Sequence, residues 1–184
     1  MKRILYIVFI TFALGANVNA SDYKIFVGGE AGASWADFDG PNGEYQNKEI
    51  KTYGAKVGID NVKTRVYLAY QYIDAYEGSN TRDGEYQTLT LNAEAFTPPL
   101  NLGIADLSLF VGGHAGAINI NVDASFGQVD EYAMLYGAQI GLMARFGSIV
   151  SLETGYRYSL SNFSKEGTDL DRFQIAYGGI NIKF

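Results

Sequence analysis

The sequence contains no cysteine, only three prolines and a single histidine, His114, among its 184 residues. The absence of cysteine excludes disulfide bonds and thiolate metal sites. A histidine-based metal site needs further ligands, and none is grouped with His114. Basic residues are outnumbered, 14 against 20 acidic, which gives a net charge of −6. The basic surface of a general nucleic-acid-binding protein is therefore missing, and no nucleic-acid partner is expected.

Long apolar runs are also missing, except at the N-terminus. Lys2 and Arg3 precede an apolar run of signal-peptide length, and Ala20 supplies the small residue of a cleavage site. The pattern predicts a signal peptide over residues 1–20 and a mature domain over residues 21–184. An N-terminal membrane anchor is the alternative, although the run is short for a spanning helix. Cleavage would leave 12 basic against 20 acidic residues, a net charge of −8.

Alternation of apolar and other residues, with a period of two, dominates the rest of the chain and predicts β-strands. Eight segments show it, and each is about long enough to cross a bilayer when tilted. They cover residues 23–35, 49–60, 62–74, 85–97, 106–118, 131–146, 149–160 and 171–184. In the last segment the apolar face changes phase after Tyr177, and a β-bulge at Gly178-Gly179 would reconcile its two halves.

The predicted connections alternate in length. Long polar links cover residues 36–48, 75–84, 119–130 and 161–170. Shorter links fall at Asp60-Asn61, at the Pro98-Pro99 stretch and at Gly147-Ser148. Long loops at one rim and short turns at the other are typical of outer-membrane barrels.

Alternation alone is also compatible with a soluble, lipocalin-like barrel whose apolar face turns inward. Here the apolar face is nearly free of charge, whereas charges and glycines share the other face, which suits a packed polar lumen. Aromatic residues of the apolar face gather near strand ends, as in the girdles at the two membrane interfaces. They are Trp35, Tyr53, Tyr70, Tyr72, Tyr132, Tyr156 and Tyr158 near one rim, and Tyr23, Phe146 and Phe184 near the other. We therefore expect Leu68, Leu91 and Ile140 to face lipid.

The chain ends on an aromatic residue, Phe184, with Ile182 two residues and Gly179 five residues before it. This ending matches the C-terminal assembly signal of outer-membrane proteins. Together with the signal peptide and the strands, it makes the chain resemble the small outer-membrane β-barrel superfamily, of the OmpA transmembrane domain, OmpX and opacity-protein type.

The resemblance implies an all-β fold, an eight-stranded antiparallel up-and-down transmembrane β-barrel in the bacterial outer membrane. Both chain ends would lie on the periplasmic side. The implied partners are outer-membrane lipid, lipopolysaccharide and the assembly machinery that reads the C-terminal strand. No cofactor is expected.

Six charged residues of the predicted lumen face are candidates for an ion-pair cluster: Glu30, Lys56, Arg65, Glu94, Glu153 and Arg157. Lys56, Arg65 and Glu94 come from three consecutive strands and lie at similar distances from the short turns. Because a buried charge is tolerable only when paired, we expect these three to form a plug near the periplasmic end. The remaining three would form a second polar layer above it.

A catalytic site is not apparent. Some eight-stranded barrels are lipid A deacylases, with serine two residues after histidine on one strand, but here Gly116 follows His114 at that spacing. The acidic pairs Asp37/Asp39 and Asp169/Asp171 lie in or beside predicted loops. We therefore expect a barrel without enzyme activity that displays four extracellular loops in a structural or surface-interaction role. A narrow, gated, porin-like channel for ions or small solutes is the alternative.

Overall fold

The computed structural model describes residues 23–40, 43–46, 50–75, 84–124, 127–162, 164–165 and 168–184. The predicted signal peptide, residues 1–20, lies outside the described residues. Within the described part of the chain, no helix has the length and hydropathy needed to span a membrane.

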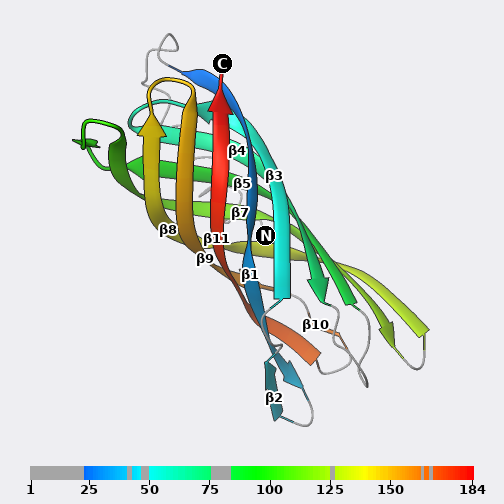
Figure 1. Ribbon diagram of the computed structural model, residues 1–184. Coiled ribbons are helices and arrows are strands. Elements are labelled where there is room, and N and C mark those ends of the chain that lie inside the picture. Colours follow the sequence, from blue (N-terminus) through cyan, green and yellow to red (C-terminus); the bar gives the residue numbers. More distant parts are fainter. Residues whose placement is uncertain are drawn as a thin grey trace, which may run out of the picture.

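Eight long antiparallel strands form the wall of a closed barrel (Figure 1). They are β1 (Lys24–Gly40), β3 (Ile50–Asp60), β4 (Thr64–Ala75), β5 (Gly84–Phe96), β7 (Asp106–Ala124), β8 (Gly127–Phe146), β9 (Val150–Ser161) and β11 (Thr168–Lys183). Three short strands are added at the rims: β2 (Gly43–Gln46), β6 (Leu100–Asn101) and β10 (Ser164–Lys165). Each long strand pairs with the next one along the chain, and β11 pairs with β1 to close the wall. The predicted fold class is thereby confirmed.

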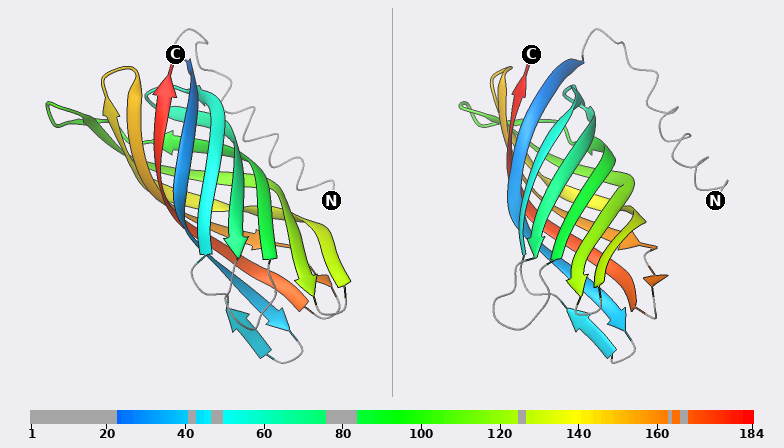
Figure 2. Two further views of the ribbon diagram at one scale, coloured as in Figure 1. Left: turned by 45° about the vertical axis from the view of Figure 1, so that its right-hand side comes forward. Right: turned by 90° about the vertical axis from the view of Figure 1, so that its right-hand side faces the viewer.

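The two ends of the barrel differ in their connections (Figure 2). At the short-turn end, residues 61–63 join β3 to β4 and residues 147–149 join β8 to β9. Both ends of the described chain meet here, because the amide of Phe184 donates a hydrogen bond to the carbonyl of Ile25 (2.9 Å). Residues 97–105, which include β6, join β5 to β7 at the same end. The opposite rim, called the long-loop end below, carries the remaining connections.

The predicted long link over residues 119–130 is wrong. β7 and β8 remain paired up to Ala124 and Gly127, and together they form a long hairpin. At the start of this segment the polarity of the two faces is reversed: Ile118 and Ile120 point inward and are buried, whereas Asn119 between them is polar. If the outward face of every strand is assumed to be apolar, a strand with an outward polar face is predicted as a loop.

The predicted β-bulge at Gly178-Gly179 is also wrong. The register of β11 runs through both glycines without a shift, against β1 on one side and β9 on the other. The shift between β11 and β1 lies elsewhere, between Asp37 and Phe38. Phe173 and Tyr177 simply point inward and are buried. The apolar residues change strand face after Tyr177 because the lumen is apolar at one level of the barrel and polar at another.

The outer surface of the barrel is apolar over most of its height. Leu68, Leu91 and Ile140 point outward, with exposed fractions of 49%, 36% and 58%. Outward positions carry no Asp, Glu, Lys or Arg in the described stretches 25–35, 53–59, 66–72, 89–95, 107–117, 132–146, 152–160 and 176–184. An uncharged apolar band around a barrel with a charged interior is the reverse of a soluble barrel.

Replacing Ile140 by arginine is expected to lower the free energy of unfolding by about 2–4 kcal/mol, because a cation at this height loses its hydration in lipid. Denaturant unfolding in lipid vesicles measures the change. The matched control is Ile104→Arg, since Ile104 lies in the link between β5 and β7 at the short-turn end and is 84% exposed. Equal effects of the two substitutions would contradict a lipid-facing Ile140.

Candidate functional site

The strongest concentration of chemistry in the molecule lies inside the barrel. The six charged residues predicted for the lumen are all buried. They come from β1 (Glu30), β3 (Lys56), β4 (Arg65), β5 (Glu94) and β9 (Glu153 and Arg157). Each lies on the inward phase of its strand, because successive side chains of a strand point to opposite faces. Three cations and three carboxylates leave this set, called the lumen network below, without net charge.

Glu153 is the centre of the lumen network. Its carboxylate pairs with Lys56 and accepts a hydrogen bond from Nη1 of Arg65 at 2.6 Å. It also accepts one from Nδ2 of Asn181 on β11 at 2.9 Å. Arg65 in turn donates from Nε to Oε2 of Glu94 at 2.8 Å. One carboxylate therefore connects two buried cations, and through Arg65 it is linked to a second acid.

Glu30 connects the first strand to the far side of the lumen. It pairs with Nζ of Lys56 at 3.2 Å and with Nη1 of Arg157 at 3.3 Å. The side-chain amide of Gln71 also donates a hydrogen bond to it. Lys56 thus pairs with Glu30 and Glu153 and not with Glu94. The six residues form one connected network instead of the two separate layers expected from the sequence.

Neutral side chains complete the lumen network, and sequence reasoning did not single them out. The hydroxyl of Tyr67 and the amide of Gln139 both donate to Oε1 of Glu94 at 2.8 Å. The carbonyl oxygen of Gln139 accepts from Nε of Arg157, also at 2.8 Å. Because desolvated charges need several hydrogen bonds, these residues hold the ions in place. The only indication in the sequence is that Tyr67 and Gln139 lie on the same strand face as the charged residues.

Arg65 is enclosed by aromatic rings as well as by acids. Its guanidinium carbon lies 4.8 Å from the ring centre of Tyr67 and 5.4 Å from that of Phe26. Phe96 and Phe110 follow at 5.7 and 5.8 Å. Ring faces attract cations and exclude water, so this side chain is both paired and dry.

The C-terminal residues predicted as an assembly signal divide between the two faces of β11. Gly179 points inward, where an added Cβ would lie 3.3 Å from Cγ of Glu153 and 3.4 Å from Cβ of Glu30. Ile182 and Phe184 point outward and are exposed. Gly179 therefore leaves room for the lumen network, whereas the other two residues belong to the apolar outer band.

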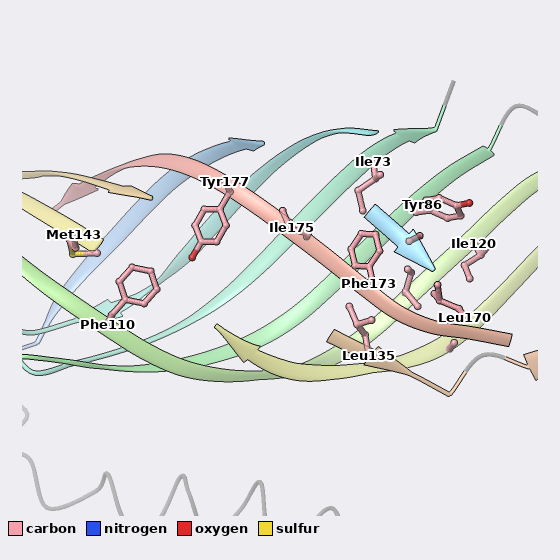
Figure 3. Packing of buried hydrophobic residues seen from close by; sticks show 13 residues of the cluster. Ile73, Tyr86, Phe110, Ile120, Leu135, Met143, Leu170, Phe173, Ile175 and Tyr177 are labelled. Carbon is pink, nitrogen blue, oxygen red and sulfur yellow. The ribbon is translucent and has the colours of Figure 1, made fainter. Parts of the chain in front are cut away.

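Toward the long-loop end the lumen changes character and becomes apolar (Figure 3). Ten buried residues, called the outer lumen cluster below, fill it: Ala36, Ile73, Tyr86, Ile118, Ile120, Ala133, Leu135, Leu170, Phe173 and Ile175. Outward neighbours are polar on two of the strands, since Phe173 lies between Arg172 and Gln174 on β11 and Ile120 lies between Asn119 and Asn121 on β7. In these parts of the wall the inside is apolar and the outside polar, as in a water-soluble protein.

The lumen is therefore filled at two successive levels. Side chains of the lumen network are at most 1% exposed, and the outer lumen cluster lies between them and the long-loop end. An eight-stranded barrel is just wide enough to be filled by its side chains. Together, the lumen network and the outer lumen cluster obstruct the axis of the barrel.

His114 has a partner that the sequence did not reveal. Its Nε2 lies 2.8 Å from Oγ of Ser159, which comes from β9 and not from the strand of the histidine. Its Nδ1 has no hydrogen-bond partner among the described residues, so the acid of a catalytic triad is missing. Both side chains are buried. No group of three or more metal-ligating side chains occurs within the described segments.

A closed barrel of eight antiparallel strands, apolar outside and charged within, has the fold of the small outer-membrane β-barrels. Neisserial surface protein A is similar over 87% of this chain and 97% of its own, with a TM-score of 0.68 and 16% identity. Outer membrane protein H (OprH) of P. aeruginosa is similar over 88% and 99%, with a TM-score of 0.57 and 24% identity. Ail, the attachment invasion locus protein of Yersinia pestis, is similar over 86% of this chain and 98% of its own, with a TM-score of 0.54 and 12% identity. No protein-family model and no curated protein matches the chain.

Proposed function

We propose that the protein is an integral barrel of the bacterial outer membrane that does not conduct ions and presents its long-loop end at the cell surface. The observation that carries the proposal is the doubly filled lumen. The lumen network blocks the axis with paired charges, and the outer lumen cluster blocks it again with apolar side chains. A barrel whose lumen is closed in this way serves as a scaffold for the loops at its rim.

The outward apolar band supports the membrane location. All backbone groups of a closed barrel are paired within the wall, which lipid requires. The band would contact outer-membrane lipid and lipopolysaccharide. The assembly machinery would read Gly179, Ile182 and Phe184 on the last strand. Four connections at the long-loop end, following β1, β4, β7 and β9, would serve as the extracellular loops.

The similar structures support a surface role. One is named a surface protein and another an attachment invasion locus protein. Ail is also described in complex with the heparin analogue sucrose octasulfate. Those names apply to those proteins; for this chain they favour a surface-interaction role over transport.

A gated channel is the rival function. Opening the axis would require Lys56 and Arg65 to leave Glu153 and to find new partners within the lumen, because an unpaired charge in a narrow lumen is costly. Residues of the outer lumen cluster would have to move as well. Two independent obstructions make a pore the less favoured proposal, and conductance distinguishes the two functions.

Surface labelling tests the proposed orientation and assembly together. The chain has no cysteine, so single cysteines can be placed at Tyr132, near the long-loop end and 74% exposed, and at Ile104, at the short-turn end. In intact cells an impermeant maleimide should label Tyr132→Cys and not Ile104→Cys. Deleting Phe184 should abolish the label, because the chain would not assemble. Labelling of Ile104→Cys alone, or full labelling without Phe184, would contradict the proposal.

A further inference from the structure

The link between β5 and β7, residues 97–105, bends away from the barrel wall and is called the β6 hairpin below. Phe96 lies opposite Phe110 in the ladder, whereas Leu100 lies opposite Leu107. Between these two pairs the link has one residue more than β7. Such an extra residue is a β-bulge, which bends its strand and accommodates the prolines of the link. In Figure 1 and in both views of Figure 2, the green link reaches sideways from the short-turn end.

The bulge determines which way the side chains of the β6 hairpin point. Residues directly opposite each other in an antiparallel ladder lie on the same face. Leu107 is on the outward phase of β7, because the next residue, Ser108, is buried in the lumen. Leu100 therefore points outward as well, and so does Leu102, two residues further along. Without the extra residue Leu100 would lie opposite Asp106, on the inward phase.

The tip of the β6 hairpin is held in shape by its own hydrogen bonds. The amide of Leu102 donates to the carbonyl of Ala105 at 2.9 Å. The side chain of Asn101 accepts from the amide of Gly103 at 3.0 Å and donates to Oδ1 of Asp106 at 2.8 Å. Gly103 has a φ of 84°, in the region that favours glycine. These polar groups bond to one another, so the apolar side chains are presented by an ordered turn.

The β6 hairpin presents an apolar surface that is continuous with the outer band of the barrel. Leu100, Leu102 and Ile104 are 62%, 56% and 84% exposed. Residues 95–105 contain no Asp, Glu, Lys or Arg. Single exposed apolar side chains are ordinary on a protein surface, whereas a contiguous group of them marks an interaction site. Because Leu100 lies beside Leu107, this group extends the outward apolar face of β7.

We propose that the β6 hairpin binds phospholipid at the periplasmic surface of the outer membrane, with Leu100, Leu102 and Ile104 inserted between the head groups. An uncharged apolar element that extends sideways from the rim meets the bilayer interface, where apolar side chains anchor a protein. The interface is less demanding than the midplane, so an arginine at Ile104 remains far less costly than one at Ile140. The inference rests on the proposed function, because it takes the short-turn end to be periplasmic.

The test compares two single cysteines in lipid nanodiscs that hold one copy of the mature chain, Ile104→Cys and Ser148→Cys. Ser148 lies in the turn between β8 and β9 at the same end and is also exposed, so it is the matched control. A water-soluble maleimide should modify Ile104→Cys at least about tenfold more slowly than Ser148→Cys, because Leu100 and Leu102 hold the tip in the interface. Replacing both leucines by serine should bring the two rates within about threefold of each other. Circular dichroism checks that each variant is folded.

A second measurement does not depend on the folding of a variant. A phospholipid with a photoreactive group just below its head group should crosslink to the β6 hairpin of the wild-type protein, and crosslinks confined to the barrel wall would overturn the proposal. So would equal maleimide rates at the two cysteines in nanodiscs. Equal rates there, with slow modification of Ile104→Cys in isolated outer membranes, would assign the hairpin to a protein partner instead. Protection only in discs that hold two copies would assign it to a second copy. Any of these results, with surface labelling of Tyr132→Cys retained, leaves the proposed function standing.

Discussion

Replacing Glu153 by alanine is expected to lower the free energy of unfolding by about 3–5 kcal/mol, as for the loss of one partner from a buried ion pair. Its carboxylate is shared by Lys56 and Arg65, both of which are fully buried. After this substitution the lumen network keeps its three cations but loses one of its three carboxylates, so one buried positive charge is left uncompensated. Denaturant unfolding in lipid vesicles, followed by the fluorescence of Trp35, the only tryptophan, measures the loss.

The matched control for this substitution is Glu85→Ala. Glu85 is exposed on β5 and accepts a hydrogen bond from the hydroxyl of Tyr72 (2.8 Å), so its loss should cost no more than about 1 kcal/mol. A double-mutant cycle between Arg65 and Glu94 measures the coupling within the lumen network. An effect at Glu153 no larger than at Glu85, together with zero coupling, would show that the network does not stabilise the barrel.

Replacing Phe173 by alanine is expected to cost about 3–5 kcal/mol, although no charge is involved. Phe173 is fully buried in the outer lumen cluster, and the barrel wall cannot collapse onto the cavity because its strands are paired on both sides. The same unfolding assay in vesicles applies. The prediction separates the outer lumen cluster from the lumen network, because the substitution leaves every ion pair in place.

Phe146→Ala is the matched control for Phe173→Ala. Phe146 lies at the short-turn end of β8 and points outward, where lipid fills the space that the ring leaves. We expect less than half the loss seen at Phe173. Equal losses would mean that the outer lumen cluster is no better packed than the outer surface.

The strand positions could be predicted from the sequence because a single period extends through most of the chain. The prediction failed where the polarity of the two faces reverses. The outward polar residues Asn119 and Asn121 give the pattern of a loop, and the inward apolar residues before Gly178-Gly179 give the pattern of a bulge. Both errors assume that the outside of a strand is apolar throughout, whereas toward the long-loop end parts of β7 and β11 have an apolar inner face and a polar outer face.

The lumen network shows a different limit. The alternation places its six residues on the inward face, yet it does not determine which of them meet. In the ladder Arg65 lies opposite Asp60 and Glu94, but its side chain reaches Glu153 on β9, a strand that does not neighbour β4. Contacts across a lumen depend on the stagger of all the strands around the barrel, which no single segment specifies. Tyr67 and Gln139 were missed because neutral residues give no charge signal.

Conductance in planar lipid bilayers tests the central claim, a lumen closed by the network and the cluster, most directly. The wild-type protein should insert without discrete current steps over a range of voltages. Glu94→Ala, which removes a partner of Arg65, should raise any ion leak through the lumen. Regular open and closed current levels from the wild type, unchanged in Glu94→Ala, would contradict a closed lumen and favour the gated channel.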